Sequence, residues 1–227
     1  MESTTPPAKG RRFRGLAPQE RQSQRREQLI EAGLNAFGGK GYHAIGVREI
    51  CAEAKLTERY FYESFANRES LFQAVYLHAI GTVRGAVLRA LGSAPRDVRA
   101  MARTAVRAFL ETLRDDPRLS RILLIDALTV SADISRQSQL ATQTFADIVG
   151  QLILSLYPGL PQQGIDAQMV ANGLVGSTVY LVMHWAFSGF REPLEKIVEH
   201  CVLFYDAAGT EAERRLAAAQ ATDTDKR

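Results

Sequence analysis

Residues 47–65, VREICAEAKLTERYFYESF, contain the pattern that decides the fold. The apolar residues of the first half have the i, i+3, i+4, i+7 spacing of a short helix with one buried face: Val47, Ile50, Cys51 and Ala54. Lys55 and Leu56 predict a tight turn, and Thr57 is a good N-cap for a second short helix that buries Phe61 and Phe65. Two short helices joined by so tight a turn predict a helix-turn-helix, whose second helix can enter a major groove.

The residues before this motif predict another helix. From Arg26 to Phe37 the apolar residues again have helical spacing, and Gly38 to Gly41 ends the pattern. This glycine cluster lacks the order of a phosphate-binding loop and follows a helix instead of a strand, so we expect a helix C-terminus.

The residues after the motif predict a long helix from Arg68 to about Leu91, with Asn67 as its N-cap. A cation such as Arg68 in the first turn opposes the helix dipole, which makes sense if an anion lies nearby. A phosphate would be such an anion.

The net charge of +3 comes entirely from the N-terminal part of the chain. Residues 1–70 hold twelve Lys or Arg against nine Asp or Glu, whereas residues 71–227 hold sixteen of each. The basic residues concentrate before residue 26, in a polar stretch without helical periodicity. This stretch is either a solvated tail or an arm that engages a phosphate backbone.

From Arg26 to Val75 the chain resembles the tetracycline-repressor (TetR) family of bacterial transcriptional regulators. The text that carries the resemblance is QLIEAGLNAFGGKGYHAIGVREICAEAKLTERYFYESFANRESLFQAV. Gly46 and Lys55 depart from the family pattern, where Thr or Ser and a turn glycine are usual, and Arg68 replaces the usual Lys. A non-glycine residue at a left-handed turn costs about 1 kcal/mol, and Arg in place of Lys keeps a phosphate contact.

The resemblance implies that Tyr62 and Arg68 touch DNA phosphates and that Thr57, Arg59 and Tyr60 lie on the recognition helix. The DNA-binding residues that we predict, which include the arm and the first helix of the motif, are Arg11, Arg12, Arg14, Val47, Arg48, Thr57, Arg59, Tyr60, Tyr62 and Arg68.

The rest of the chain is helical by the same tests, and no alternating strand pattern occurs, so we predict an all-α fold. Further helices are expected over 95–114, 119–128, 134–157, 164–188 and from Pro193 onward. The segment from Ala167 to Phe190 has no charged residue and is long enough to span a bilayer. Its polar residues favour a helix buried among other helices, so we expect no membrane association.

The family resemblance also implies a ligand pocket and a dimer interface in the C-terminal part, built in the family by the last two long helices. The residues predicted to bind an effector are Phe109, Leu113, Phe145, Ile148, Asn172, Tyr180 and His184. The residues predicted for the dimer interface are Gly173, Gly176, Ser177, Trp185, Ile197, Cys201 and Tyr205.

These patterns predict four parts of the chain: a basic flexible arm over 1–25, a three-helix DNA-binding domain over 26–72, an effector-binding and dimerisation domain over 73–209, and a polar tail over 210–227. The four histidines lack ligand spacing and no nucleophile motif occurs, so we expect no enzyme, metal or cofactor. The predicted function is a cytoplasmic homodimeric repressor, released from a palindromic DNA operator by a small, largely apolar effector. The alternative is an architectural DNA-binding protein without an effector.

Overall fold

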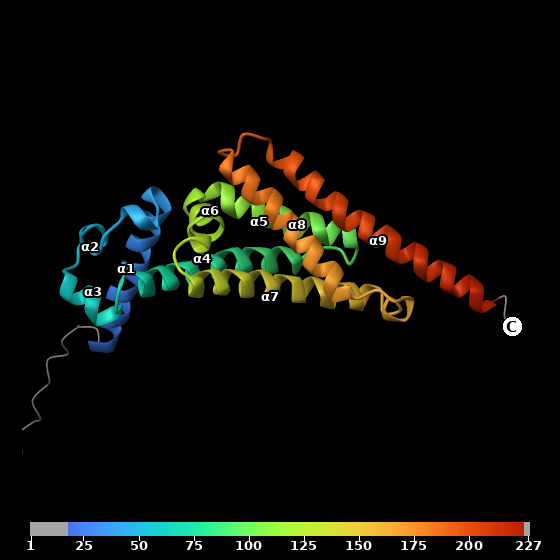
Figure 1. Cartoon of the computed structure of the whole chain (residues 1–227), viewed down its shortest axis with the longest axis horizontal. Coiled ribbons are helices and arrows are strands. Elements are labelled where there is room, and N and C mark those ends of the chain that lie inside the picture. The colour runs from blue at the N-terminus through green and yellow to red at the C-terminus, as the bar shows by residue number, and fades with distance from the viewer. Residues whose placement is uncertain (1–17, 225–227) are drawn as a thin grey trace, which may run out of the picture.

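The structure, a computed structural model, describes residues 18–224, which form helices and loops without any strand (Figure 1). The α-helices are α1 (Pro18–Lys40), α2 (Val47–Ala54), α3 (Glu58–Ser64), α4 (Arg68–Leu91), α5 (Val98–Asp115), α6 (Pro117–Leu124), α7 (Ala132–Leu156), α8 (Ala167–Phe187) and α9 (Leu194–Thr224). Short 3₁₀ helices are η1 (Tyr42–Ala44), η2 (Asp126–Leu128) and η3 (Pro161–Gln163). The all-α prediction is confirmed.

The N-terminal domain packs α1, α2 and α3 around an aromatic core. Phe72 at the start of α4 has its ring 5.5 Å from that of Phe37 and 5.2 Å from that of Tyr42. Gly41 ends α1 with a φ of 89°, a conformation that side chains disfavour. Lys55 takes the left-handed conformation in the turn between α2 and α3, as the sequence predicts, with a φ of 54°.

Helix α4 belongs to both domains and joins them (Figure 1). Its predicted bounds are confirmed, and Asn67 caps it by accepting a hydrogen bond from the backbone N–H of Ser70 at 2.8 Å. Among the described residues, α4 is the one helix that is long and apolar enough to cross a membrane. It packs against α1, α5 and α6, as the core helix of a folded domain does.

The C-terminal domain is a layered bundle in which α7 packs on α8 and α5 packs on α4 and α9. Three arginines, each one helical turn after the previous one on α5, pair with acidic residues of α9: Arg99 with Asp206, Arg103 with Glu199, and Arg107 with Glu195. Because these pairs are largely exposed, each adds little stability. Together they fix the side on which α9 meets α5.

Two of the predicted boundaries are wrong. Helix α1 already begins at Pro18, so only residues 1–17 of the expected arm lie outside the described residues. Helix α9 continues to Thr224, so most of the expected polar tail is helical. Alanines are frequent after Thr210, and alanine has the highest helix propensity, which explains the extension.

The two domains also meet where α1 contacts α6. A Cβ on Gly38 would lie 2.4 Å from the Cβ of Arg118, so only a glycine allows this approach. The Arg118 guanidinium then reaches Asn35 and Glu31 of α1 and Asp116 at the start of α6. Nearby, the backbone N–H of Tyr42 donates to the buried Asp126 carboxylate at 3.0 Å.

Candidate DNA-binding surface and ligand cavity

The outer face of α3 is polar and accessible. The Arg59 side chain is 84% exposed and the Tyr62 residue 57%. Thr57 occupies the N-cap position as predicted, but its hydroxyl makes no capping hydrogen bond. This hydroxyl can therefore form a hydrogen bond with a ligand at the surface, next to the first turn of the helix.

Helix α1 supports α3 from behind with two arginines. The guanidinium of Arg25 lies 4.5 Å from the ring centre of Tyr60, and that of Arg26 lies 4.9 Å from the ring centre of Phe65. Cation–π contacts of this kind fix the orientation of the ring. Tyr60, which is half-buried, therefore offers less free surface than Tyr62.

The acidic residues of the motif neutralise several of its cations. Arg48 pairs with Glu58 at 3.2 Å and Arg59 pairs with Glu63 at 3.1 Å. Exposed pairs contribute about 0.2–1 kcal/mol at most, so a phosphate can replace the carboxylate at little cost. Val47, in contrast, is half-buried at the start of α2 and offers only part of its side chain.

Arg68 has a structural role that the sequence does not reveal. Its guanidinium lies 4.1 Å from the ring centre of Tyr42 and donates to the backbone carbonyl of Ile45 at 2.5 Å. Arg68 thereby connects α4 to the loop that begins α2. A guanidinium has five N–H donors, so donors remain for a phosphate.

The arm residues Arg11, Arg12 and Arg14 lie outside the described residues, and their predicted role stays a prediction.

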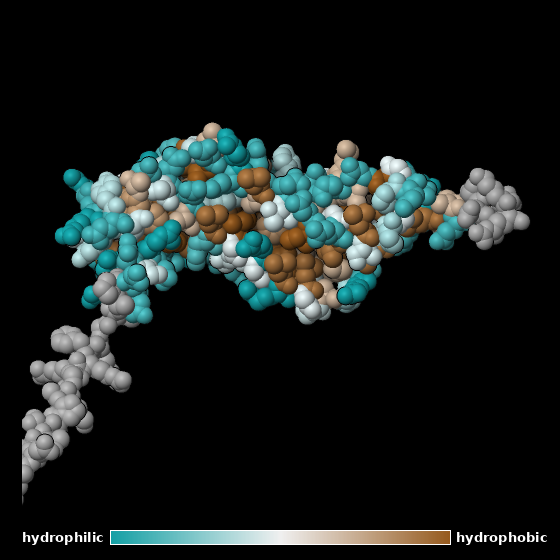
Figure 2. All heavy atoms as spheres, turned by 90° about the horizontal axis from the view of Figure 1, so that it is seen from below, coloured by the Kyte–Doolittle hydropathy of each residue, from teal (hydrophilic) through white to brown (hydrophobic). Residues whose placement is uncertain are grey.

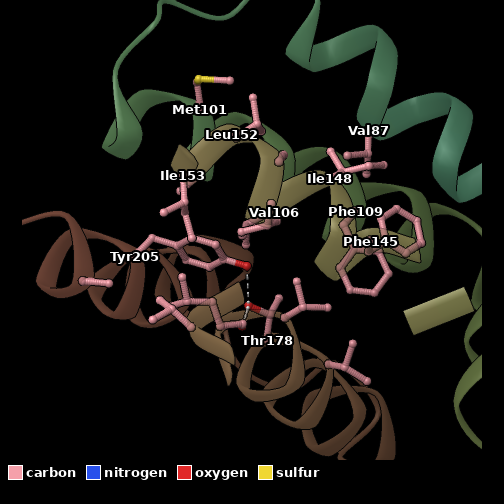
Figure 3. A pocket seen from close by; sticks show the side chains of 18 of the residues that line it. Val87, Met101, Val106, Phe109, Phe145, Ile148, Leu152, Ile153, Thr178 and Tyr205 are labelled. Atoms are coloured by element: carbon pink, nitrogen blue, oxygen red, sulfur yellow. Dashed lines mark hydrogen bonds between the residues drawn. The ribbon is translucent and has the colours of Figure 1, made fainter. Parts of the chain in front are cut away.

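A long apolar cavity of about 310 Å³ lies inside the C-terminal domain (Figure 3). Six helices line it: α4, α5, α6, α7, α8 and α9. Its walls are almost entirely aliphatic and aromatic, with Val87, Met101, Val106, Phe109, Phe145, Ile148, Leu152 and Ile153 among them. The mid-cavity polar groups are the hydroxyls of Thr178 and Tyr205, 3.2 Å apart. Burial raises the pKa of the Tyr205 phenol, so this group is neutral at physiological pH.

The cavity contains only some of the residues that the sequence predicts for it. Phe109, Phe145 and Ile148 line it, whereas Leu113 is buried in the core between α5 and α6. Tyr180 is 63% exposed and His184 is exposed, because both lie on the outer face of α8, where they have no access to the cavity. Asn172 lies in a separate surface groove and accepts hydrogen bonds from Gln143 and Gln168.

The outer faces of α8 and α9 carry large exposed apolar side chains. These are Met169, Tyr180, Phe187, Leu203 and Phe204. Gly173 and Gly176 lie among them, with nothing within 4 Å of an added Cβ. Figure 2 shows the molecule from below, the side on which α7 lies in Figure 1; apolar side chains gather in its middle as well, while the end with α1–α3 is largely hydrophilic.

Three predicted interface residues point into the protomer instead. Trp185 is 3% exposed, packs on Phe190 and donates its indole N–H to the Glu192 carbonyl. Cys201 is fully buried, and Tyr205 lines the cavity. Trp185 and Cys201 have too little free surface for a partner, whereas Tyr205, Ser177 and Ile197 are half-buried and keep some.

Most residues of the cavity wall were not predicted from the sequence. The one usable signal is on α5, where Ala102 and Ala105 interrupt a stripe of larger apolar residues. Small residues on an inward face leave space that neighbouring side chains do not fill. Among the described residues, no group of His, Cys, Asp and Glu is arranged to hold a metal ion.

The chain is similar to known bacterial regulatory proteins. The family model "Bacterial regulatory proteins, tetR family" matches residues 29–75. The HTH-type transcriptional activator FasR of Mycolicibacterium smegmatis is 30% identical over 198 residues, which cover 87% of each chain. The fatty acid degradation regulator FadR from Bacillus halodurans has a TM-score of 0.68 at 16% identity, with 85% of this chain and 96% of that chain covered. FadR from Bacillus subtilis, solved in complex with stearoyl-CoA, has a TM-score of 0.67 at 14% identity, with 79% and 96% covered.

Proposed function

Since the chain belongs to the tetR family of bacterial regulatory proteins, we propose that it is a homodimeric regulator whose affinity for a palindromic operator changes when an apolar ligand fills its cavity. The chain is a transcriptional regulator and not an enzyme. One observation carries the proposal: a single helix, α4, runs from the exposed helix-turn-helix into the cavity wall. A change in the cavity can therefore move the DNA-binding surface.

The ligand that the cavity favours is a long alkyl chain. Along α7 the lining extends from Ser138 to Tyr157, which is roughly 28 Å at the helical rise per residue. In the described part of the chain, Glu211 is the one charged residue of the wall, so a carboxylate or phosphate has no cation to pair with inside. We propose a fatty acid or its thioester, with the charged head at the opening. FadR from Bacillus subtilis binds such a molecule, stearoyl-CoA.

Gel-shift assays with stearic acid and with stearoyl-CoA test the ligand. We expect the full-length protein to bind operator DNA and at least one of the two ligands to change that affinity at least tenfold. The comparison of the two separates the free acid from the thioester. Unchanged DNA binding with both, despite a cavity shown to be filled by mass spectrometry of the intact dimer, would contradict the proposal.

The direction of regulation is a separate part of the proposal. The sequence predicts repression with operator release, while the FasR relative is a transcriptional activator. Binding upstream of a promoter can activate, whereas binding across it blocks the polymerase. A reporter fused to the footprinted promoter, measured with and without the gene for this protein, decides between the two. We place the protein in the cytoplasm, together with the DNA.

The homodimer has its own test at Gly176. An added side chain meets nothing within the protomer, so Gly176→Arg should fold normally and disturb only what covers the outer face of α8. We expect monomers by light scattering and a loss of operator binding, because each monomer reads one half-site. Gly81→Arg, at a glycine of α4 with equally free space around it, is the matched control that should stay dimeric. A dimeric Gly176→Arg variant would exclude this face.

A further inference from the structure

The hydroxyls of Thr178 and Tyr205 form an isolated polar spot in the middle of the cavity (Figure 3). Thr178 comes from α8 and Tyr205 from α9, and the labelled side chains around them are apolar. The wall also holds a few other polar residues, which are Tyr76, Ser138, Thr142, Tyr157 and Glu211. The spot faces the chain of any ligand that fills the cavity.

The hydrogen atoms of this pair can be assigned. The Thr178 hydroxyl lies 2.9 Å from the carbonyl oxygen of Leu174, which can only accept, so Thr178 donates its single proton there. The Tyr205 hydroxyl, 3.2 Å from Thr178 Oγ1, must then donate to it. Both protons are used, and the Tyr205 oxygen keeps accepting capacity toward the cavity.

Holding α8 against α9 does not require this pair. Fully or almost fully buried apolar side chains already join the two helices, among them Val182, Val198 and Cys201. A bare alkyl chain across the spot would cover the Tyr205 oxygen without offering it a hydrogen, which is unfavourable. A hydroxyl on the chain would supply that hydrogen.

We propose that Tyr205 recognises a hydroxyl group on the ligand chain, so that the preferred ligand is a hydroxylated long-chain acyl compound rather than a plain one. This inference rests on the proposed function, because it concerns the same cavity. A keto group, which can only accept, would have to take the Tyr205 proton away from Thr178. The expected order of affinity is hydroxyl above keto, and hydroxyl above plain chain.

The experiment is a calorimetric comparison of matched ligands on the full-length dimer. The ligands are oleic and ricinoleic acid, hydroxystearic acids that differ in hydroxyl position, the corresponding ketostearic acids, and the coenzyme A thioesters of all. We expect the hydroxylated chain, at its best position, to bind roughly three- to tenfold more tightly than the plain chain, the range for one neutral hydrogen bond.

Two variants distinguish recognition from packing. Tyr205→Phe keeps the ring and should abolish the preference by weakening only the hydroxylated ligand. Thr178→Val frees the Tyr205 proton and should move the preference toward the keto ligand, which a merely structural contact would not do. Tyr157→Phe removes a tyrosine hydroxyl that donates to Glu213 instead, and should keep the hydroxyl preference.

Equal affinities of the parent for plain and hydroxylated chains at every position would overturn the inference, as would a preference that survives in Tyr205→Phe. If plain chains still bind and alter DNA affinity in that case, the proposed function stands. If no chain binds at all, both are wrong.

Discussion

The two halves of the molecule use apolar residues in opposite ways. In the DNA-binding half, Phe37, Tyr42 and Phe72 fill the interior with aromatic contacts. In the ligand half, six helices surround a cavity of about 310 Å³. The filled half is complete without a ligand, whereas the hollow half lacks partner atoms along its inner wall. The difference indicates that a ligand acts by completing the packing of one half while the other keeps its shape.

Similar truncations in both halves test this difference most directly. Phe72→Ala should lower the free energy of unfolding by about 3–5 kcal/mol, because the ring is fully buried among aromatic neighbours. Phe145→Ala, in the cavity wall, removes the same group and should cost less, because part of this ring already faces open space. Urea unfolding measures both. Similar losses would mean that the second half is not hollow in solution.

Ligand binding should stabilise the hollow half selectively. A ligand at about one hundred times its Kd adds roughly 2.7 kcal/mol to the folded state that binds it. Hydrogen exchange should slow in α5, α7, α8 and α9 and stay constant in α1 to α3. If α1 to α3 gain as much protection, the two halves form one cooperative unit.

The DNA-binding half can be tested at its surface without disturbing its packing. Arg59→Ala should weaken operator binding by about 1–3 kcal/mol and relax its sequence preference. The free energy of unfolding should not change, because the side chain is 84% exposed. Arg136→Ala, an exposed arginine of the other half, is the matched control. Anisotropy with labelled operator gives both affinities, and equal values for the two variants would contradict the assignment of α3.

The smallest expected effect lies where the halves meet, at Asp126. Burial raises the pKa of this carboxyl, although the hydrogen bond from the Tyr42 N–H opposes the shift. A raised pKa means that the folded state holds the proton more tightly than the unfolded state does. The protonated carboxyl therefore adds to the free energy of unfolding below the usual carboxyl range, and this stabilisation is lost as the pH rises through the raised pKa. Asp126→Asn should make the free energy of unfolding less dependent on pH in that range. A difference between parent and variant that does not depend on pH would show that the carboxyl titrates normally.

The sequence predicts the two halves unequally well. The turn at Lys55 and the cap at Asn67 depend on neighbouring residues, so short-range patterns predict them correctly. The cavity depends on which faces of distant helices converge. Helix α8 has no charged residue to mark its outer side, so periodicity could not separate the inward Thr178 from the outward Tyr180. For the same reason Tyr205, correctly placed on the apolar stripe of α9, was assigned to a partner instead of the interior.

The shared helix α4 also limits how such a protein can change over generations. One residue inserted between Phe72, in the DNA-binding core, and Ile80, in the cavity wall, would rotate everything beyond it by about 100° and shift it by roughly 1.5 Å. The aromatic core and the cavity could not both survive that rotation. Point substitutions can change the operator or the ligand independently of each other. The length of α4 between Phe72 and Ile80 cannot change, because the DNA-binding domain and the cavity both depend on it.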